Sequence, residues 1–283
     1  MSAILERARP SEPARVVTFD GAKRSEREDR VAGEEPLEIR VRAGGESKTI
    51  AITMRTPGHD FELAAGFLFA EGVIAGVDDI REMTYCLEGS VDADQQYNIV
   101  NVDLARATLP DLVALERHFT TTSACGVCGR ASLEALRDRG VGSVTSELTV
   151  TPAVITALPE TLRSGQRVFD ATGGLHAAAR FDANGKLRAV REDVGRHNAF
   201  DKLIGNALLE RNVPLANDIV LVSGRTSYEL VQKTIAAGAP VLCAVSAPSS
   251  LAVAMARDFG VTLVGFLRGA RFNVYAHEER IAG

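Results

Sequence analysis

The chain has 283 residues, of which 46% are hydrophobic and 24% charged, so it can form one large globular domain or two smaller ones. Its net charge of −5 and pI near 5.7 give no overall positive field to attract nucleic acid or an anionic membrane. No apolar run reaches the ~18 residues of a membrane span, and the N-terminus lacks the apolar core of a signal peptide, so we expect a cytoplasmic protein that binds neither nucleic acid nor a membrane.

Two segments make up the N-terminal half. Residues 1–35 mix charges of both signs with two prolines, and we interpret them as a partly ordered leader. Residues 36–150 predict an N-terminal α+β domain that carries the cysteine loop described below. Its expected elements are strands at 37–41 and 49–54, a helix at 59–70 with Asp60 as N-cap, a strand at 97–104 and a helix at 129–139.

A different pattern begins at residue 151, and residues 151–283 predict an α/β domain. The expected elements are a helix at 152–164, a strand-like stretch at 168–181, a hairpin partner at 186–191, a helix at 197–211, strands at 219–222, 240–245 and 261–267, and helices at 226–237 and 249–259. Strands and helices that alternate in short units favour right-handed crossovers and a sheet covered on both faces.

Two cysteines three residues apart are the strongest chemical signal. Cys125 and Cys128 lie between a Thr/Ser-rich stretch and the helix predicted at 129–139. A helix N-terminus lowers the pKa of a thiol and so favours the nucleophilic thiolate, and Arg130 adds a nearby cation. The pattern indicates a reactive thiol pair that carries sulfur as a persulfide, which is the chemistry of a sulfurtransferase.

Other uses of the pair remain open on the residues alone. A structural zinc site needs two further ligands, and neither Cys86 nor Cys243 has a neighbouring Cys or His at ligand spacing. We therefore expect no metal site, and we expect Cys243 to be a core residue because it lies in an apolar run. Dithiol–disulfide exchange is typical of a pair that follows the first strand of a compact βαβ unit, which is not the context here.

Three strand ends in the C-terminal domain lead into polar loops. The loops are residues 223–227, 246–250 and 266–271. The first includes Ser223, Gly224 and Arg225. The third comprises Phe266, Leu267, Arg268, Gly269, Ala270 and Arg271. Ligands of open α/β sheets bind beyond the carboxyl ends of the strands, where helix N-termini favour phosphate. We expect a nucleotide or another pyrophosphate-bearing ligand, although ordinary helix caps and surface arginines would give the same pattern.

Further sequence features bear on which functions and site residues are expected. No P-loop or G-x-G-x-x-G fingerprint is present, so neither ATP hydrolysis nor NAD chemistry is indicated. Residues 191–198, which include Asp193 and His197, hold an unusual density of ionisable groups, for which helix capping with surface ion pairs is an equal alternative to a functional role. His176, on a predicted strand, is the type of histidine that more often packs than reacts.

Five segments closely resemble the formate dehydrogenase accessory protein family, also called FdhD. They are residues 121–129, 172–178, 192–199, 223–225 and 266–269, and they occur in order between residue 35 and the C-terminus. The resemblance implies a sulfur carrier that takes persulfide sulfur from a cysteine desulfurase and transfers it to the bis-molybdopterin guanine dinucleotide cofactor of formate dehydrogenase. Cys125 matches the family's persulfide position, with Cys128 as companion.

The resemblance also implies a binding site, an assembly and a fold. The segment from Phe266 to Arg271 matches the family's cofactor-binding stretch, and we group Ser223, Gly224, Arg225 and His197 with it. Guanosine diphosphate is expected to mimic the cofactor there. The formate dehydrogenase catalytic subunit is the expected client, and a homodimer is the expected assembly. The implied fold is α/β, with a cytidine-deaminase-like three-layer sandwich behind the smaller N-terminal α+β domain.

Two rival functions follow from these expectations. A zinc nucleobase deaminase needs H-x-E on one helix and P-C-x-x-C on the next, but Ala199 occupies the position of the Glu and the next helix has no cysteines. Deamination is therefore not expected. The other rival is a non-catalytic cofactor-binding chaperone, in which Cys125 and Cys128 bind zinc or only stabilise their loop.

Overall fold

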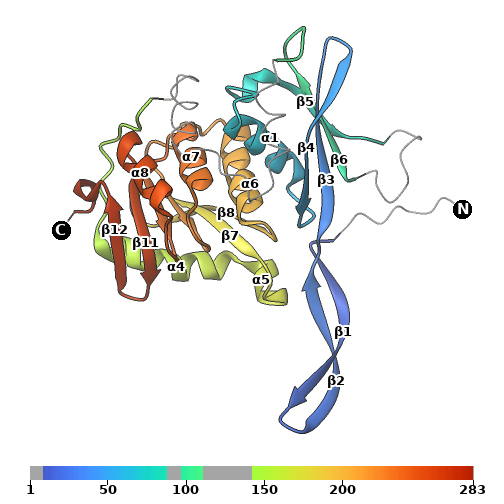
Figure 1. The fold of residues 1–283 in the computed structure, drawn as a ribbon, viewed down its shortest axis with the longest axis vertical. Helices are drawn as coiled ribbons and strands as arrows, with labels where there is room; N and C mark the ends of the chain where they lie inside the picture. The colour runs from blue at the N-terminus through green and yellow to red at the C-terminus, as the bar shows by residue number, and fades with distance from the viewer. Residues whose placement is uncertain (1–8, 88–96, 111–141, 283) are drawn as a thin grey trace, which may run out of the picture.

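The computed structural model describes residues 9–87, 97–110 and 142–282, which form a mixed α/β fold with three sheets (Figure 1). A two-stranded hairpin lies at the N-terminal end, a four-stranded sheet follows, and a six-stranded sheet forms the C-terminal half. None of the described helices is both long and apolar enough to cross a membrane.

The first sheet is a hairpin within the stretch interpreted as a leader. β1 (Ser11–Asp20) and β2 (Lys23–Ala32) pair antiparallel over ten residues each, with Gly21 at φ 58° in the turn. No strand is expected here from the sequence, because β2 is polar on both faces and so lacks the apolar/polar alternation of a half-buried strand. Cross-strand pairing of opposite charges supports the hairpin instead.

The second sheet has the order β4-β3-β6-β5, and β3 and β6 are parallel. It confirms the strands predicted at 37–41, 49–54 and 97–104 and the helix predicted at 59–70, and it adds β5, which was not predicted. The helix predicted at 129–139 lies outside the described residues. The elements are β3 (Glu35–Ala43), β4 (Glu46–Arg55), α1 (Asp60–Ala70), the 3-10 turn η1 (Val77–Asp79), β5 (Ile80–Tyr85) and β6 (Ile99–Leu104).

The predicted N-cap of α1 is wrong. The N-cap is His59, in the left-handed region at φ 57°, and it makes no side-chain cap bond. Asp60 is 4% exposed, and its carboxylate accepts two hydrogen bonds from Arg55, at 3.0 and 3.1 Å. The Asp60 carboxylate, which the sequence pattern predicts to cap the helix, is therefore bound by the buried guanidinium of Arg55 instead.

The third sheet has the order β12-β11-β10-β9-β7-β8. β9, β10 and β11 are parallel, as predicted, while β7, β8 and β12 are antiparallel to their neighbours. The strands are β7 (His176–Phe181), β8 (Leu187–Asp193), β9 (Ile219–Val222), β10 (Val241–Ala244), β11 (Thr262–Arg268) and β12 (Arg271–Ala276). β12 was not predicted from the sequence.

One prediction in this half needs correction. The strand-like stretch at 168–181 divides into the short helix α5 (Arg167–Thr172) and β7. The carboxylate of Glu192 accepts hydrogen bonds from the backbone N–H groups of Val168 (3.0 Å) and Phe169 (2.7 Å) at the start of α5. A tertiary contact of this kind overrides the strand preference of the local sequence.

Helices cover both faces of the six-stranded sheet, as expected. α4 (Pro152–Gly165) packs on one face, where Ala179, Leu221 and Cys243 point, and the opposite face carries α6 (Arg196–Leu209), α7 (Tyr228–Ala236) and α8 (Ser250–Phe259). The chain ends after the 3-10 turn η3 (Glu278–Arg280). The core on the α6 side continues into α1 and the four-stranded sheet, so both halves share one hydrophobic core.

Two glycines let the halves approach closely. A Cβ added to Gly66 of α1 would lie 1.9 Å from the carbonyl oxygen of Asp201, and one added to Gly205 of α6 would lie 1.8 Å from that of Glu62. Each glycine thus faces the backbone of the other helix. The boundary that we predict at residue 150 separates two sequence patterns that meet in this helix–helix contact.

Candidate functional site

The polar loops predicted as a binding site lie together at one edge of the six-stranded sheet. β9, β10 and β11 are parallel, so their carboxyl ends share an edge, and the antiparallel β7 begins there. The backbone N–H of Thr226 donates to Ala247 O (3.2 Å), and that of Phe266 donates to Ser246 O (3.1 Å). These bonds join the three loops into one continuous rim.

A pocket of about 340 Å³ opens at the β11–β12 end of the rim, lined by Phe266, Arg268, Arg271 and Asn273. Phe266 has φ 52°, in the left-handed region that non-glycine residues rarely occupy, beside an irregularity in the pairing of β11 with β12. This conformation costs on the order of 1 kcal/mol or more. It leaves the residue 42% exposed, so an aromatic ring is displayed beside two guanidinium groups.

The stretch 266–271 divides between pocket and core. Arg268 is exposed and anchored by a hydrogen bond from its Nε to Val245 O (3.2 Å). Leu267 is fully buried in the core on the α4 side and does not line the pocket. Gly269, at φ 54°, and Ala270 are exposed in the turn between the strands. The structure therefore brings Phe266, Arg268 and Arg271 to one pocket and directs Leu267 away from it.

His197 joins the first turn of α6 to the start of α7. Its Nε2 lies 3.1 Å from Glu229 Oε2 and 3.2 Å from Ser227 Oγ, and the Ser227 hydroxyl donates to Glu229 Oε2 (2.8 Å). The hydrogen bond from His197 holds the pKa of Glu229 at about 2 despite partial burial. Serine and carboxylate contact the same ring nitrogen, so this is not the relay of a hydrolytic triad, in which each uses a different nitrogen.

Gly224 lies against a second histidine. A Cβ at Gly224 would be 3.5 Å from His176 Nδ1 and 3.7 Å from the Cδ of Arg196. Burial, followed by the nearby charges of Arg196 and His197, lowers the pKa of His176, so its ring is neutral at pH 7. The Arg196 Nε is buried and has no hydrogen-bond partner among the described residues. A guanidinium and a neutral imidazole therefore flank the backbone of this loop.

The two remaining residues of the predicted loop differ in what they offer a ligand. The Ser223 hydroxyl accepts a hydrogen bond from the backbone N–H of Ala177 (2.9 Å), which fixes the loop to β7. Arg225 is exposed. Of the two, Arg225 has the side chain that reaches solvent at the rim.

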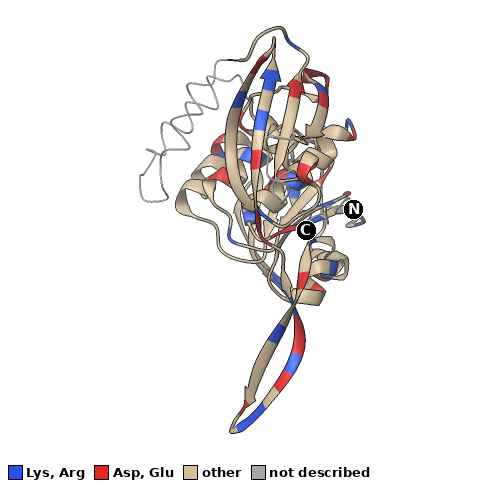
Figure 2. Ribbon diagram, turned by 90° about the vertical axis from the view of Figure 1, so that its right-hand side faces the viewer, with Lys and Arg blue, Asp and Glu red and all other residues tan. Residues whose placement is uncertain are grey.

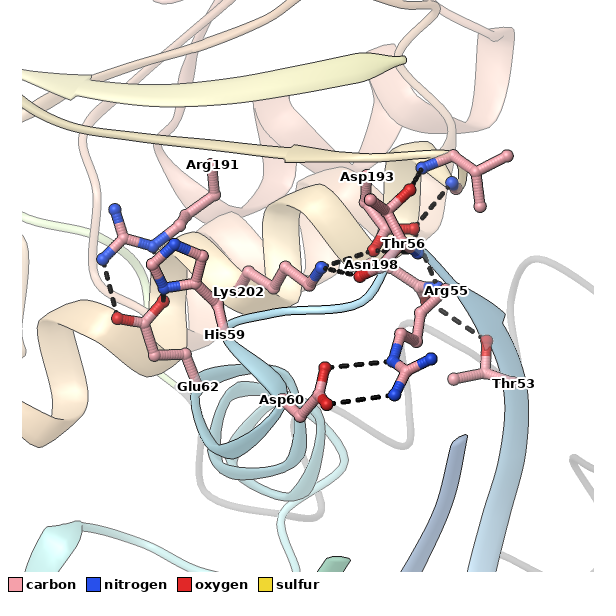
Figure 3. Close-up of polar contacts among 12 residues, drawn as sticks. Thr53, Arg55, Thr56, His59, Asp60, Glu62, Arg191, Asp193, Asn198 and Lys202 are labelled. Atoms are coloured by element: carbon pink, nitrogen blue, oxygen red, sulfur yellow. Dashed lines mark hydrogen bonds and ion pairs between the residues drawn. The ribbon is translucent and has the colours of Figure 1, made fainter. Parts of the chain in front are cut away.

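Asp193 is the centre of a buried polar network behind the rim (Figure 3). It is 0% exposed, and its Oδ2 lies 2.7 Å from Lys202 Nζ and accepts a hydrogen bond from the backbone N–H of Thr56 (3.1 Å). Its Oδ1 accepts from the Gly195 N–H (2.8 Å) and from Asn198 Nδ2 (3.2 Å). Asp193 thus fixes the start of α6, and with it Arg196 and His197, against the connection between β4 and α1.

A second charged pair joins the halves beside this network. Arg191 Nη2 donates to Glu62 Oε1 (2.7 Å), and His59 Nδ1 lies 3.1 Å from Glu62 Oε2 (Figure 3). Burial alone would raise the pKa of Glu62, but the bonds from Arg191 and His59 outweigh it and hold the pKa at about 2. Glu62 is therefore ionised in the folded protein at any physiological pH.

Sequence reasoning missed several of these residues. The density of ionisable groups at 191–198 was the only signal for the network, and it did not show that Asp193 is buried or that Thr56 and Lys202 are its partners. Asn273 was missed because β12 was not anticipated. Contacts between residues as far apart as Thr56 and Asp193 leave no trace in local sequence patterns.

Cys125 and Cys128 lie outside the described residues. Of the other two cysteines, Cys86 and Cys243 are both free and buried. Burial raises the pKa of Cys243 to about 12, which keeps it protonated and confirms it as a core residue. Within residues 9–87, 97–110 and 142–282, no cluster of three or more His, Cys, Asp or Glu side chains could hold a metal ion.

Comparison with known proteins identifies relatives along nearly the whole chain. Residues 32–282 match the model of the FdhD/NarQ family. The sulfur carrier protein FdhD of Streptomyces avermitilis is 52% identical over 277 residues, which cover 97% of this chain and 96% of that protein. The sulfur carrier protein FdhD of Sulfurisphaera tokodaii is 48% identical over 254 residues, 90% of this chain and 92% of that protein.

A solved structure supports the same relationship. The crystal structure of a putative formate dehydrogenase accessory protein from Desulfotalea psychrophila matches with a TM-score of 0.73 and 27% sequence identity. The match covers 96% of this chain and 99% of that one. Sequence and structure comparisons therefore agree over both halves of the molecule.

Proposed function

The chain belongs to the FdhD/NarQ family, and from that premise we propose that it is a sulfur carrier required for formate dehydrogenase activity. The observation that carries the proposal is the 52% identity, over 97% of the chain, to a protein named a sulfur carrier. The pair Cys125 and Cys128 supplies the thiols that such a carrier requires.

The proposed reaction is a sulfur transfer in the cytoplasm, with this chain as sulfurtransferase. The Cys125 thiolate attacks the terminal sulfur of a cysteine desulfurase persulfide, so that Cys125 gains that sulfur and the desulfurase cysteine leaves as a thiolate. Attack of Cys128 on the Sγ of Cys125 then releases the sulfur as hydrosulfide and leaves a Cys125–Cys128 disulfide. Both steps balance without an external oxidant, and a thiol reductant regenerates the pair.

The proposed acceptor is the bis-molybdopterin guanine dinucleotide cofactor, held at the rim of the six-stranded sheet. A guanine dinucleotide presents a planar base and a pyrophosphate. Phe266 displays a ring for stacking, Arg268 and Arg271 offer charge-assisted hydrogen bonds, and Arg196 places a guanidinium beside Gly224. These properties support the rim as the site for such a ligand and for guanosine diphosphate as its mimic.

The proposed function also includes a fold class for the C-terminal half and a homodimeric assembly. We place the C-terminal half in the cytidine-deaminase-like class, which the α4, sheet and α6–α8 layers support, without deaminase chemistry because Ala199 replaces the required Glu. The working unit is proposed to be a homodimer that receives sulfur from the desulfurase and serves the formate dehydrogenase catalytic subunit.

The test is persulfide loading. The purified chain is incubated with a cysteine desulfurase and free cysteine, and its mass is measured under non-reducing conditions. We expect a gain of one sulfur atom on wild type and on Cys86→Ala, whose cysteine is buried, but not on the double variant C125A/C128A. No gain on wild type, or an equal gain on the double variant, would leave the non-catalytic cofactor-binding chaperone as the better explanation.

A further inference from the structure

The β1–β2 hairpin, residues 11–32, projects from the rest of the molecule in two perpendicular views (Figures 1 and 2). We call it the N-terminal arm. α5 lies against its base. Among the described residues, β1 and β2 pair only with each other, so both outer edges of the ribbon are open. Open edges of this kind are templates for pairing with another chain.

The arm exposes apolar side chains that its own ribbon cannot cover. Phe19 is 69% exposed, Val17 46% and Val31 48%. The register pairs Val17 with Glu26 and Phe19 with Arg24, so Val17 and Phe19 lie side by side on one face. A two-stranded ribbon is only marginally stable alone in water, and an exposed phenylalanine beside a valine adds nothing to its stability until a partner covers them.

Charges on the arm indicate what that partner is. Lysine or arginine and aspartate or glutamate alternate along the ribbon (Figure 2). The arm has a net charge of zero, whereas the whole chain has a net charge of −5. Its five cations are Arg15, Lys23, Arg24, Arg27 and Arg30, and its five anions are Glu12, Asp20, Glu26, Glu28 and Asp29. Because the charges of the arm balance and several pair within it, such as Arg15 with Glu26 and Arg27 with Asp29, a second copy meets no net repulsion, whereas nucleic acid or an anionic membrane would require a cationic excess.

The area of the arm is sufficient for a stable pair. Ten residues per strand give a ribbon about 33 Å long and about 10 Å wide, so one face covers about 330 Å². In a twofold dimer each arm and the surface beneath it are both covered, and two such contacts bury about 1,300 Å² in total. Stable protein interfaces bury about 1,200–2,000 Å².

We propose that the N-terminal arm docks on a second copy of this chain and forms the dimer contact, with Val17 and Phe19 at its centre. The inference rests on the homodimer of the proposed function and adds the interface. Residues 11–31 of the arm lie outside the range 32–282 that the family model matches.

The first test is the oligomeric state of the full chain by light scattering after size exclusion. Wild type is expected to be a dimer, and V17D/F19D is expected to be a monomer with an unchanged far-UV circular dichroism spectrum. Ile52→Asp is the matched control, because Ile52 is 68% exposed on β4, outside the arm, and this variant should remain a dimer. A dimer that persists in V17D/F19D, or a wild type that is monomeric, would overturn the proposal.

A second experiment avoids the two charged substitutions of V17D/F19D. A photo-reactive phenylalanine analogue replaces Phe19, and isotopically light and heavy chains are mixed before irradiation. We expect mixed-isotope cross-links, which form only between two chains, whereas cross-links confined to one chain would overturn the proposal. Persulfide loading of the same samples is expected to be unchanged. Failure of the proposed arm contact therefore changes the cross-links, whereas failure of the proposed sulfur-carrier function changes the persulfide loading.

Discussion

The backbone decides which side chains of the candidate site line its pocket. Within one short stretch, Phe266 is 42% exposed at the pocket while its neighbour Leu267 is fully buried in the core. The left-handed conformation of Phe266 and the irregular strand pairing beside it set this division. The residue types alone, an aromatic, a leucine and two arginines, do not show which of them face the pocket.

Arg268→Ala is expected to weaken the binding of guanosine diphosphate by about 1.5–3 kcal/mol, because it removes a charge-assisted hydrogen bond to the phosphates. Isothermal titration calorimetry measures the change. Arg188→Ala is the matched control, since Arg188 is paired with Asp182 near the turn between β7 and β8, at the opposite edge of the sheet. Unchanged affinity in Arg268→Ala, or an equal loss in both variants, would remove Arg268 from the site.

At the scale of elements, the contact between α1 and α6 determines how the two halves fit together. Gly66 and Gly205 each face the backbone of the opposite helix, so the helices approach more closely than side chains would allow. Around this contact, Asp193, Lys202 and Thr56 form the buried network that positions the start of α6. The site-forming residues Arg196 and His197 are therefore placed by an element from the other half.

Gly66→Ala is expected to destabilise the protein by about 1–3 kcal/mol or more, because its Cβ would overlap the carbonyl oxygen of Asp201 and force the helices apart. The free energy of unfolding from urea titration gives the change. Gly76→Ala serves as the control, since no atom lies within 4 Å of its added Cβ and its φ of −168° is ordinary extended backbone. Equal stability of Gly66→Ala and wild type would contradict this account of the contact.

Prediction of the elements succeeded where the local pattern and the tertiary environment agree. The buried parallel strands β9, β10 and β11 and helices α4 and α6 were predicted, because apolar runs and helical spacing are strong local signals. The β1–β2 hairpin and α5 were not. β2 is polar on both faces, and the start of α5 is bound by Glu192, whose carboxylate accepts from Val168, 24 positions away in the sequence.

At the scale of the whole molecule, one hydrophobic core is shared by both halves. Charged pairs where the halves meet make the stability of the protein depend on pH. The pKa of Glu62 is about 2 in the folded protein, below its ordinary value of 4.5. A depressed carboxyl pKa contributes stability that is fully present above the unfolded value and is lost as the pH falls through the folded one. This contribution should therefore disappear between about pH 4.5 and about pH 2.

Glu62→Gln is expected to lower stability by about 2 kcal/mol at pH 7, because it leaves Arg191 without its anionic partner. The difference from wild type should shrink below pH 4.5 and vanish near pH 2, as measured by urea unfolding at several pH values. Asp78→Asn is the control, since Asp78 pairs with Arg211 at the exposed surface and such pairs contribute little. A difference for Glu62→Gln that stays constant from pH 7 to pH 2 would contradict the linkage.

The sequence by itself determined the family and the alternating C-terminal elements, because each is written in contiguous motifs or in local periodicity, and it supplied the prediction that Cys125 and Cys128 are reactive. It also placed the polar loops at one sheet edge, since parallel strands bring their carboxyl ends together. Only the tertiary structure decided that Asp193 is buried, that Phe266 and Asn273 share a pocket and that the N-terminal arm projects. These properties depend on contacts between residues distant in the chain, and burial and exposure are fixed only when both halves pack around their shared core.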